Sequence, residues 1–171
     1  MPDYRRDLLR DQFDLTWALF EYHLERLEPE DFLWEPAELC WTLRRGPGGV
    51  WTPDWADSEP NPVPVPTIAW LTWHIGWWWT VTLDHTLGRT PQDRAEIRWP
   101  GEEGAADWLR GMGLDWVEAL SEMDLDRPAS FPWQGADGKT NAHTAAWVNS
   151  ELMKNVSEVG QLRLLRAASR R

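Results

Sequence analysis

The sequence predicts an all-α protein, a four-helix bundle that forms a single domain over residues 1–171. Four segments place apolar residues at the three- and four-residue steps of an amphipathic helix. The two longest segments between them are rich in proline and glycine, and no convincing sheet pattern is present. A chain of this length can bury a core that needs no disulfide to hold it.

The first helix is expected between Asp3, a suitable N-cap, and Pro29, which ends it. The second is expected from Thr67, whose hydroxyl can cap it, to about Gly88. One face of the first helix carries Leu9, Phe13, Trp17, Phe20, Leu24 and Leu27.

The third helix is expected directly behind Pro100-Gly101, with Glu102 and Glu103 in its first turn, where the helix dipole favours carboxylates. Its apolar face carries Leu109, Met112, Trp116, Leu120 and Met123.

The fourth helix is expected from Thr140 or Asn141 to about Arg166. Arg163 and Arg166 then lie at its negative end, where the dipole favours cations. Its buried face is formed by Ala145, Val148, Leu152, Val156, Val159 and Leu162.

A long crossover rich in tryptophan and proline, Trp34 to Pro66, connects the first two helices. A connection of this length in a compact domain is usually functional or wraps the body as an arm. Within it, residues 40–44 and 50–55 favour weak strand pairing. Asp126 to Lys139 forms a second loop.

Composition excludes several classes of function. The chain has 17 basic and 28 acidic residues, a formal charge of −11, which repels the phosphates of nucleic acids. Residues 67–83, the longest apolar stretch, are too few and too polar for a membrane span. One cysteine, Cys40, and no secretory signal pattern lead us to expect a soluble cytoplasmic protein. The 15 tryptophans fill a core or line a pocket.

One constellation could support chemistry. His74, on the second helix, faces the core among tryptophans, and Glu151 and Asn155 share a stripe on the fourth helix beside its apolar row. An imidazole and a carboxylate from facing helices are the beginning of a metal site in helical bundles. The alternative is a satisfied core histidine, with Glu151 and Glu158 as rim carboxylates bonded to arginine or tryptophan N–H groups.

Several runs carry a resemblance to a known family: Trp34-Glu35-Pro36 with CWTLRR, then PTIAWLTWHIGWWW, then WVNSELMKNVSEVGQLRLL. In this order the chain resembles the DinB/YfiT-like superfamily of bacterial proteins, which includes YfiT-like metal proteins and the mycothiol-dependent maleylpyruvate isomerase. The resemblance implies a four-helix bundle with a long crossover. It also implies a metal held by one histidine of the second helix, which His74 matches, and by a pair on the fourth, of which Glu151 matches the first.

The second ligand of that pair is where the chain departs from the family. Lys154 and Asn155 stand where the resemblance implies a histidine three or four residues after Glu151. Lysine cannot ligate while protonated, and asparagine offers only a neutral oxygen, so zinc or nickel should bind weakly or not at all. The expected metal positions are therefore His74, Glu151 and Asn155, and Asn155→His is the substitution expected to restore the site.

Other ligands could complete the site. Glu158, His23 or water are the candidates that the sequence leaves open. We further expect His74, Glu151 and Asn155 to converge on one cavity, with His74 within about 8 Å of the Glu151 carboxylate, because the ligands of one ion lie in a small sphere.

Two functions follow from these patterns. The first is a metal-dependent, thiol-transferase-type enzyme in which a metal at His74 and Glu151 lowers the pKa of a low-molecular-weight thiol. The second is a non-catalytic bundle that binds a small molecule or serves as a dimerisation module. A homodimer is the expected assembly, with no nucleic-acid or membrane partner.

Overall fold

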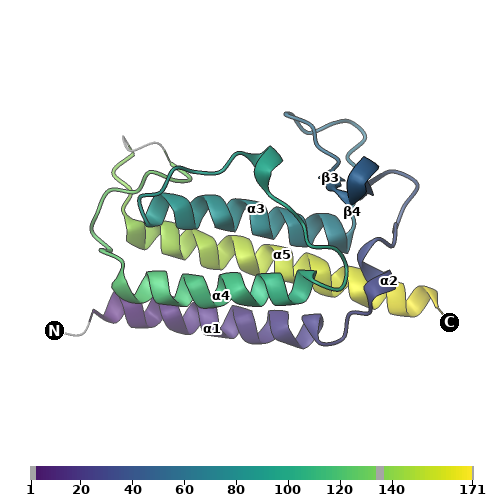
Figure 1. The fold of residues 1–171 in the computed structure, drawn as a ribbon. Coiled ribbons are helices and arrows are strands. Elements are labelled where there is room, and N and C mark those ends of the chain that lie inside the picture. Colours follow the sequence, from purple (N-terminus) through teal and green to yellow (C-terminus); the bar gives the residue numbers. More distant parts are fainter. Residues whose placement is uncertain (1–2, 134–136, 171) are drawn as a thin grey trace.

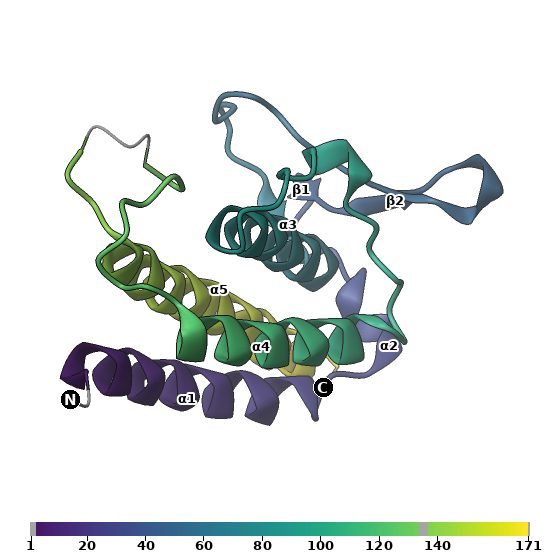
Figure 2. The same cartoon turned by 60° about the vertical axis from the view of Figure 1, so that its left-hand side comes forward.

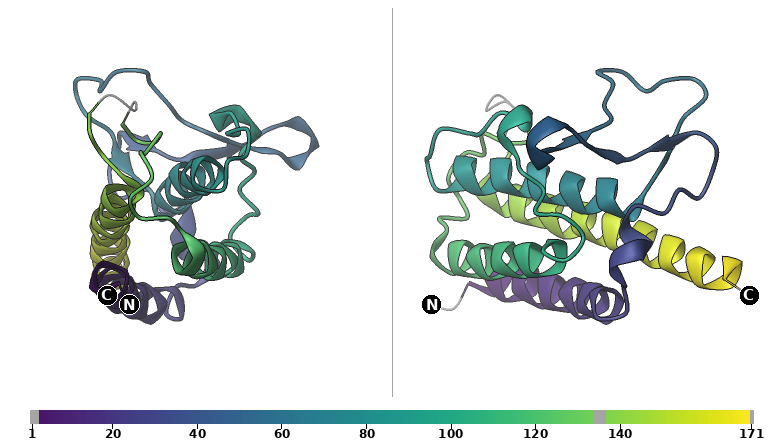
Figure 3. Two further views of the ribbon diagram at one scale, coloured as in Figure 1. Left: turned by 90° about the vertical axis from the view of Figure 1, so that its left-hand side faces the viewer. Right: turned by 45° about the vertical axis from the view of Figure 1, so that its right-hand side comes forward.

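Four long helices lie side by side and form the body of the protein (Figure 1). The computed structural model describes residues 3–133 and 137–170. The long helices are α1 (Tyr4–Leu24), α3 (Ile68–Thr86), α4 (Ala105–Glu122) and α5 (Asn141–Ser169). Viewed end-on, α1 lies beside α4 and α5, and α3 lies beside the same two helices (Figure 3, left). The mostly helical fold predicted from periodicity is confirmed.

Helix α1 begins where its sequence predicts. The Asp3 carboxylate accepts a hydrogen bond from the Arg5 backbone N–H at 3.0 Å, which satisfies one of the free donors of the first turn. Phe13 and Phe20 are fully buried against the other helices. The helix ends at Leu24, and Pro29, expected only to end it, also begins the short helix α2 (Pro29–Phe32).

Helix α3 is apolar around most of its circumference, and most of its residues are buried. Thr67 caps it as predicted, accepting from the Trp70 backbone N–H at 3.2 Å. Trp73 and Trp79 are fully buried on it. The Thr72 hydroxyl accepts a hydrogen bond from the Trp99 indole at 3.0 Å, so the connection to α4 also packs onto α3.

The crossover between α2 and α3 contains four short strands. β2 (Leu43–Arg45) pairs antiparallel with β3 (Trp51–Pro53) around the 3-10 turn η1 (Pro47–Gly49), close to the weak pairing that the sequence favours. β1 (Cys40–Trp41) pairs in parallel with β4 (Val65–Pro66), which the sequence pattern did not predict. Figure 2 shows the β2–β3 hairpin projecting away from the helices.

The crossover packs on the protein's own body through tryptophans. Trp41 stacks on Trp70 of α3 with ring centroids 5.1 Å apart, and Trp55 contacts Trp77 edge to face at the same separation. Arg94, in the 3-10 helix η2 (Arg94–Glu96), lies over the Trp55 ring at 4.1 Å. The long crossover is therefore an arm that covers α3.

The start of α4 differs from the prediction. Glu102 and Glu103 lie in a turn before the helix, which begins at Ala105. Gly101 has φ +93°, a conformation that L residues with side chains rarely adopt, and its carbonyl accepts from the Ala105 backbone N–H at 3.0 Å. This turn delays the helix by one turn relative to the sequence pattern.

Helix α5 begins at Asn141 and continues to Ser169, about one turn beyond the predicted end at Arg166. The loop expected at Asp126–Lys139 lies partly outside the described residues, because the described chain breaks between 133 and 137. Within the described ranges, none of the helices has the length and apolar character needed to cross a bilayer.

Helices α1 and α5 pack in very close contact at one point. Gly160 of α5 lies against the ring of His23, which is 8% exposed, and a Cβ at this glycine would overlap that ring. The Arg163 guanidinium donates to His23 Nδ1 at 3.2 Å. A neutral histidine accepts this hydrogen bond, whereas a protonated one cannot.

This contact predicts a pH dependence of stability. Burial, followed by the charges of Arg163 and Arg26, lowers the pKa of His23. The unfolded chain then binds this proton at a higher pH than the folded chain. We expect the free energy of unfolding to decrease as the pH falls from above the pKa of His23 in the unfolded chain to below its pKa in the folded chain. Urea unfolding between about pH 8 and pH 5 should show a flatter profile for His23→Gln than for the wild type; equal slopes would contradict this.

Candidate functional site

His74 of α3 and Glu151 of α5 meet between the two helices. His74 Nε2 lies 3.8 Å from Glu151 Oε1, which confirms the predicted proximity of these two residues. Their side chains are 17% and 21% exposed. The separation exceeds hydrogen-bond distance, so the two groups lie close together without a direct hydrogen bond.

Aromatic packing holds the imidazole in this position. The His74 ring stacks on Trp70 with centroids 4.9 Å apart and planes 11° from parallel, and Trp77 packs beside it at 5.6 Å. His74 Nδ1 is buried and has no hydrogen-bond partner among the described residues. Stacking therefore directs Nε2 toward the Glu151 carboxylate.

Lys154 contacts the same oxygen of the Glu151 carboxylate. Its Nζ lies 2.5 Å from Glu151 Oε1, one helical turn along α5. His74 and the Lys154 ammonium lower the pKa of Glu151 below its ordinary value, against burial, which raises it. Glu151 is thus an anion at neutral pH with a lysine as its counter-ion.

Asn155 also lies between α3 and α5, but its side chain makes other contacts. It is 1% exposed, and its Oδ1 accepts a hydrogen bond from Trp78 Nε1 of α3 at 3.1 Å. Its Nδ2 donates to Glu158 Oε2 at 2.8 Å. The amide links α3 to α5, and its role as a metal ligand stays a prediction.

The remaining histidines lie in other contacts. His23 bonds to Arg163 in the α1–α5 seam, His85 lies 3.0 Å from the Ser130 hydroxyl, and His143 closes the first turn of α5. Across residues 3–133 and 137–170, no three His, Cys, Asp or Glu side chains are grouped so that they could hold a metal ion.

Sequence reasoning missed two residues of the site. Lys154 was considered only as a lost ligand, although a lysine three residues after a glutamate on a helix is a common ion pair. Trp78 follows His74 by four residues and therefore lies on the same face of α3. Its indole bonds to Asn155 and contacts Trp147 at 5.4 Å, so it fills the seam beside the His74–Glu151 pair.

The donors present do not fit zinc or nickel. One imidazole faces the site, the carboxylate is already neutralised by Lys154, and the Asn155 amide is engaged at both ends. These metals prefer several imidazole or thiolate ligands.

Fold and site together define a protein of four packed long helices with a histidine–carboxylate pair between two of them. A family model of the DinB superfamily matches residues 12–159, from α1 to the second half of α5, and includes both members of the pair. The chain belongs to the DinB superfamily. No curated protein and no solved structure matches it significantly.

Proposed function

We propose that this chain is a non-catalytic DinB-type four-helix bundle in which an ion pair between Lys154 and Glu151 takes the place of a metal, and that it acts as a small-molecule-binding or dimerisation module. The observation that carries the proposal is the contact of Lys154 Nζ with Glu151 Oε1 at 2.5 Å. It supplies the positive charge that the carboxylate would otherwise take from a metal.

The set of donors present favours this state over a metal-bound one. A cation entering beside Glu151 would have to displace the Lys154 ammonium, and it would gain only His74 as a further strong donor. The half-buried indoles of Trp77, which packs on His74, and of Trp147, which packs on Trp78, support a role in contacting an apolar or aromatic small molecule.

The second candidate is the metal-dependent, thiol-transferase-type enzyme. It is favoured by one observation, namely that His74 and Glu151 still face each other across the helices. With the donors present we derive no step through a metal, and a low-molecular-weight thiol stays a prediction.

Metal binding separates the two candidates. We expect purified, untagged protein to contain less than one equivalent of zinc or nickel, and its melting temperature to be the same with and without added zinc. Glu151→Gln should behave in the same way. A full equivalent that survives dialysis against chelator, and that is lost in Glu151→Gln, would overturn the proposal in favour of the enzyme.

A further inference from the structure

An exposed apolar stripe runs the length of α1. Leu15 is 70% exposed, Leu8 60% and Leu19 38%, and tyrosines lie at both ends, Tyr4 at 83% and Tyr22 at 48%. Their spacings of three, four and seven residues place them on one side of the helix. This is the pattern of a helix that packs against another helix, yet within the described chain it faces outward.

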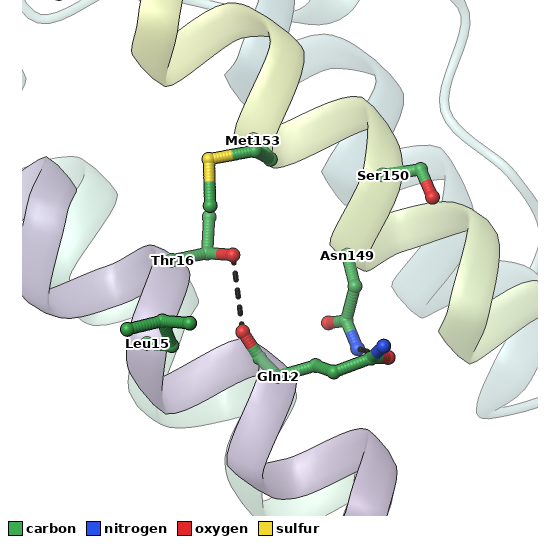
Figure 4. Close-up of a pocket in the computed structure, with 6 residues that line it drawn as sticks. All are labelled: Gln12, Leu15, Thr16, Asn149, Ser150 and Met153. Atoms are coloured by element: carbon green, nitrogen blue, oxygen red, sulfur yellow. Dashed lines mark hydrogen bonds between the residues drawn. The ribbon is translucent and has the colours of Figure 1, made fainter.

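Recesses accompany the stripe. Helices α1 and α5 run in the same direction, since Leu9 is level with Asn149 and His23 with Arg163. Between them lies a groove of about 280 Å³, shown in Figure 4, which is lined by Gln12, Leu15, Thr16, Asn149, Ser150 and Met153.

Asn149 is a second, independent sign of an incomplete contact in this groove. The residue is 6% exposed, and its Nδ2 donates to the Leu9 carbonyl at 2.9 Å. Its Oδ1 is buried and has no partner among the described residues, and it points into the space between the helices in Figure 4. A buried acceptor without a donor is costly, so a donor arriving in the groove would be favoured.

A second groove of about 260 Å³ lies nearer the start of α1. Its walls, formed largely by apolar atoms, come from Arg5, Leu8, Leu9, Ala142, His143 and Ala146. The face therefore carries protruding leucines and recesses side by side. A two-fold dimer needs such a face, because the same patch must supply both halves of the contact.

The stripe also reads almost the same from either end: Tyr4, Leu8, Gln12, Leu15, Leu19, Tyr22. We propose that two copies of this chain dimerise through the α1–α5 face, with their α1 helices antiparallel and the two-fold axis between Gln12 and Leu15. Tyr4 then lies opposite Tyr22 of the second copy and Leu8 opposite its Leu19. Leu15 of the second copy lies opposite Gln12, and Gln12 of the second copy lies opposite Leu15 at the same groove, where its side-chain amide N–H is the donor that Asn149 Oδ1 lacks.

The area of the α1–α5 face and the charge of the chain both agree with a second copy as the partner. A helix of 21 residues is about 32 Å long, and two packed helices are about 20 Å wide, so the face approaches the roughly 800 Å² per partner of a standard interface. The chain carries a charge of −11, so two copies can approach closely only through a face with few charges. The six residues of the stripe are uncharged, and the charged residues directly beside them on this side of the helix are Arg5 and Asp11.

This inference rests on the dimerisation part of the proposed function and is independent of the His74–Glu151 site. Sedimentation or light scattering of the full chain should give twice the 19.9 kDa of one copy. Leu15→Glu/Leu19→Glu should weaken dimerisation by at least about a hundredfold, because two carboxylates would be buried without partners in each half of the contact. Leu114→Glu on α4, where the leucine is 72% exposed on another face, should leave the dimer intact.

Disulfide trapping tests the register, and it does not require the charged variant to fold. In a Cys40→Ser background, Leu8→Cys mixed with Leu19→Cys should give a disulfide-linked heterodimer, whereas Leu8→Cys alone should not cross-link. A wild type that stays monomeric would overturn the proposal. So would a dimer that Leu15→Glu/Leu19→Glu leaves unchanged, or efficient cross-linking of Leu8→Cys to itself. None of these experiments measures or alters metal content. A failed dimerisation test is therefore distinguishable from a failure of the proposal for the His74–Glu151 site, which metal analysis tests.

Discussion

Lys154→His is expected to give a protein that zinc stabilises, whereas we expect no zinc stabilisation of the wild type. The substitution removes the ammonium that lies 2.5 Å from Glu151 and places an imidazole three residues after it, the Glu-x-x-His spacing of metal-binding bundles. His74, already 3.8 Å from the same carboxylate oxygen, becomes the third donor.

The expected effect is large. Metal that binds only the folded state raises its stability by about 2.7 kcal/mol at a hundredfold excess over Kd. For a domain of this size that is a rise of about 5–11 °C in melting temperature, at roughly 2–4 °C per kcal/mol. Thermal melting with and without zinc is the measurement.

Asn155→His is the informative comparison, because the sequence alone favours it as the repair. The structure predicts the opposite ranking of the two variants. Asn155 is 1% exposed and accepts the Trp78 indole hydrogen bond, so its replacement disturbs that bond and the packing around it. We expect a lower melting temperature without metal and a smaller zinc response than for Lys154→His. A larger response from Asn155→His would show that the family's third ligand lay on the Trp78 side.

Gly76→Ala is expected to destabilise the fold, although alanine favours helices. Gly76 lies in the middle of α3, and the Trp108 indole of α4 rests directly on its backbone, so a Cβ would overlap the ring. Overpacking of this kind costs about 1–3 kcal/mol. A net loss of about 2 kcal/mol would lower the melting temperature by about 4–8 °C.

Gly111→Ala is the matched control for this prediction. Gly111 is in α4, also mid-helix, but an added Cβ there meets nothing within 4 Å. The same chemical change should therefore stabilise the protein by up to about 1 kcal/mol through helix propensity alone. Opposite signs for the two variants, measured by thermal or urea unfolding, are the expected result; a neutral Gly76→Ala would show that Trp108 moves aside freely.

Much of the fold could be predicted from local signals. Apolar steps of three and four located all four long helices, and Asp3 and Thr67 were recognised as caps because capping depends on residues adjacent in the chain. The start of α4 was placed too early, since the carboxylates of Glu102 and Glu103 suit a first helical turn equally well. The turn at Gly101 decided the boundary instead.

For the candidate site too, the sequence indicated some residues and the structure was needed for others. Sequence by itself identified His74 and Glu151 as facing residues, because helical spacing and the family resemblance both indicate them. The pairing of Lys154 with Glu151 is a local contact that their three-residue spacing could have indicated. Only the tertiary structure decided that Asn155 turns to Trp78. Only the tertiary structure showed that the outward leucines of α1 lie beside a groove formed with α5. Periodicity determines which face of a helix a residue occupies, whereas the partner across that face depends on how distant segments pack.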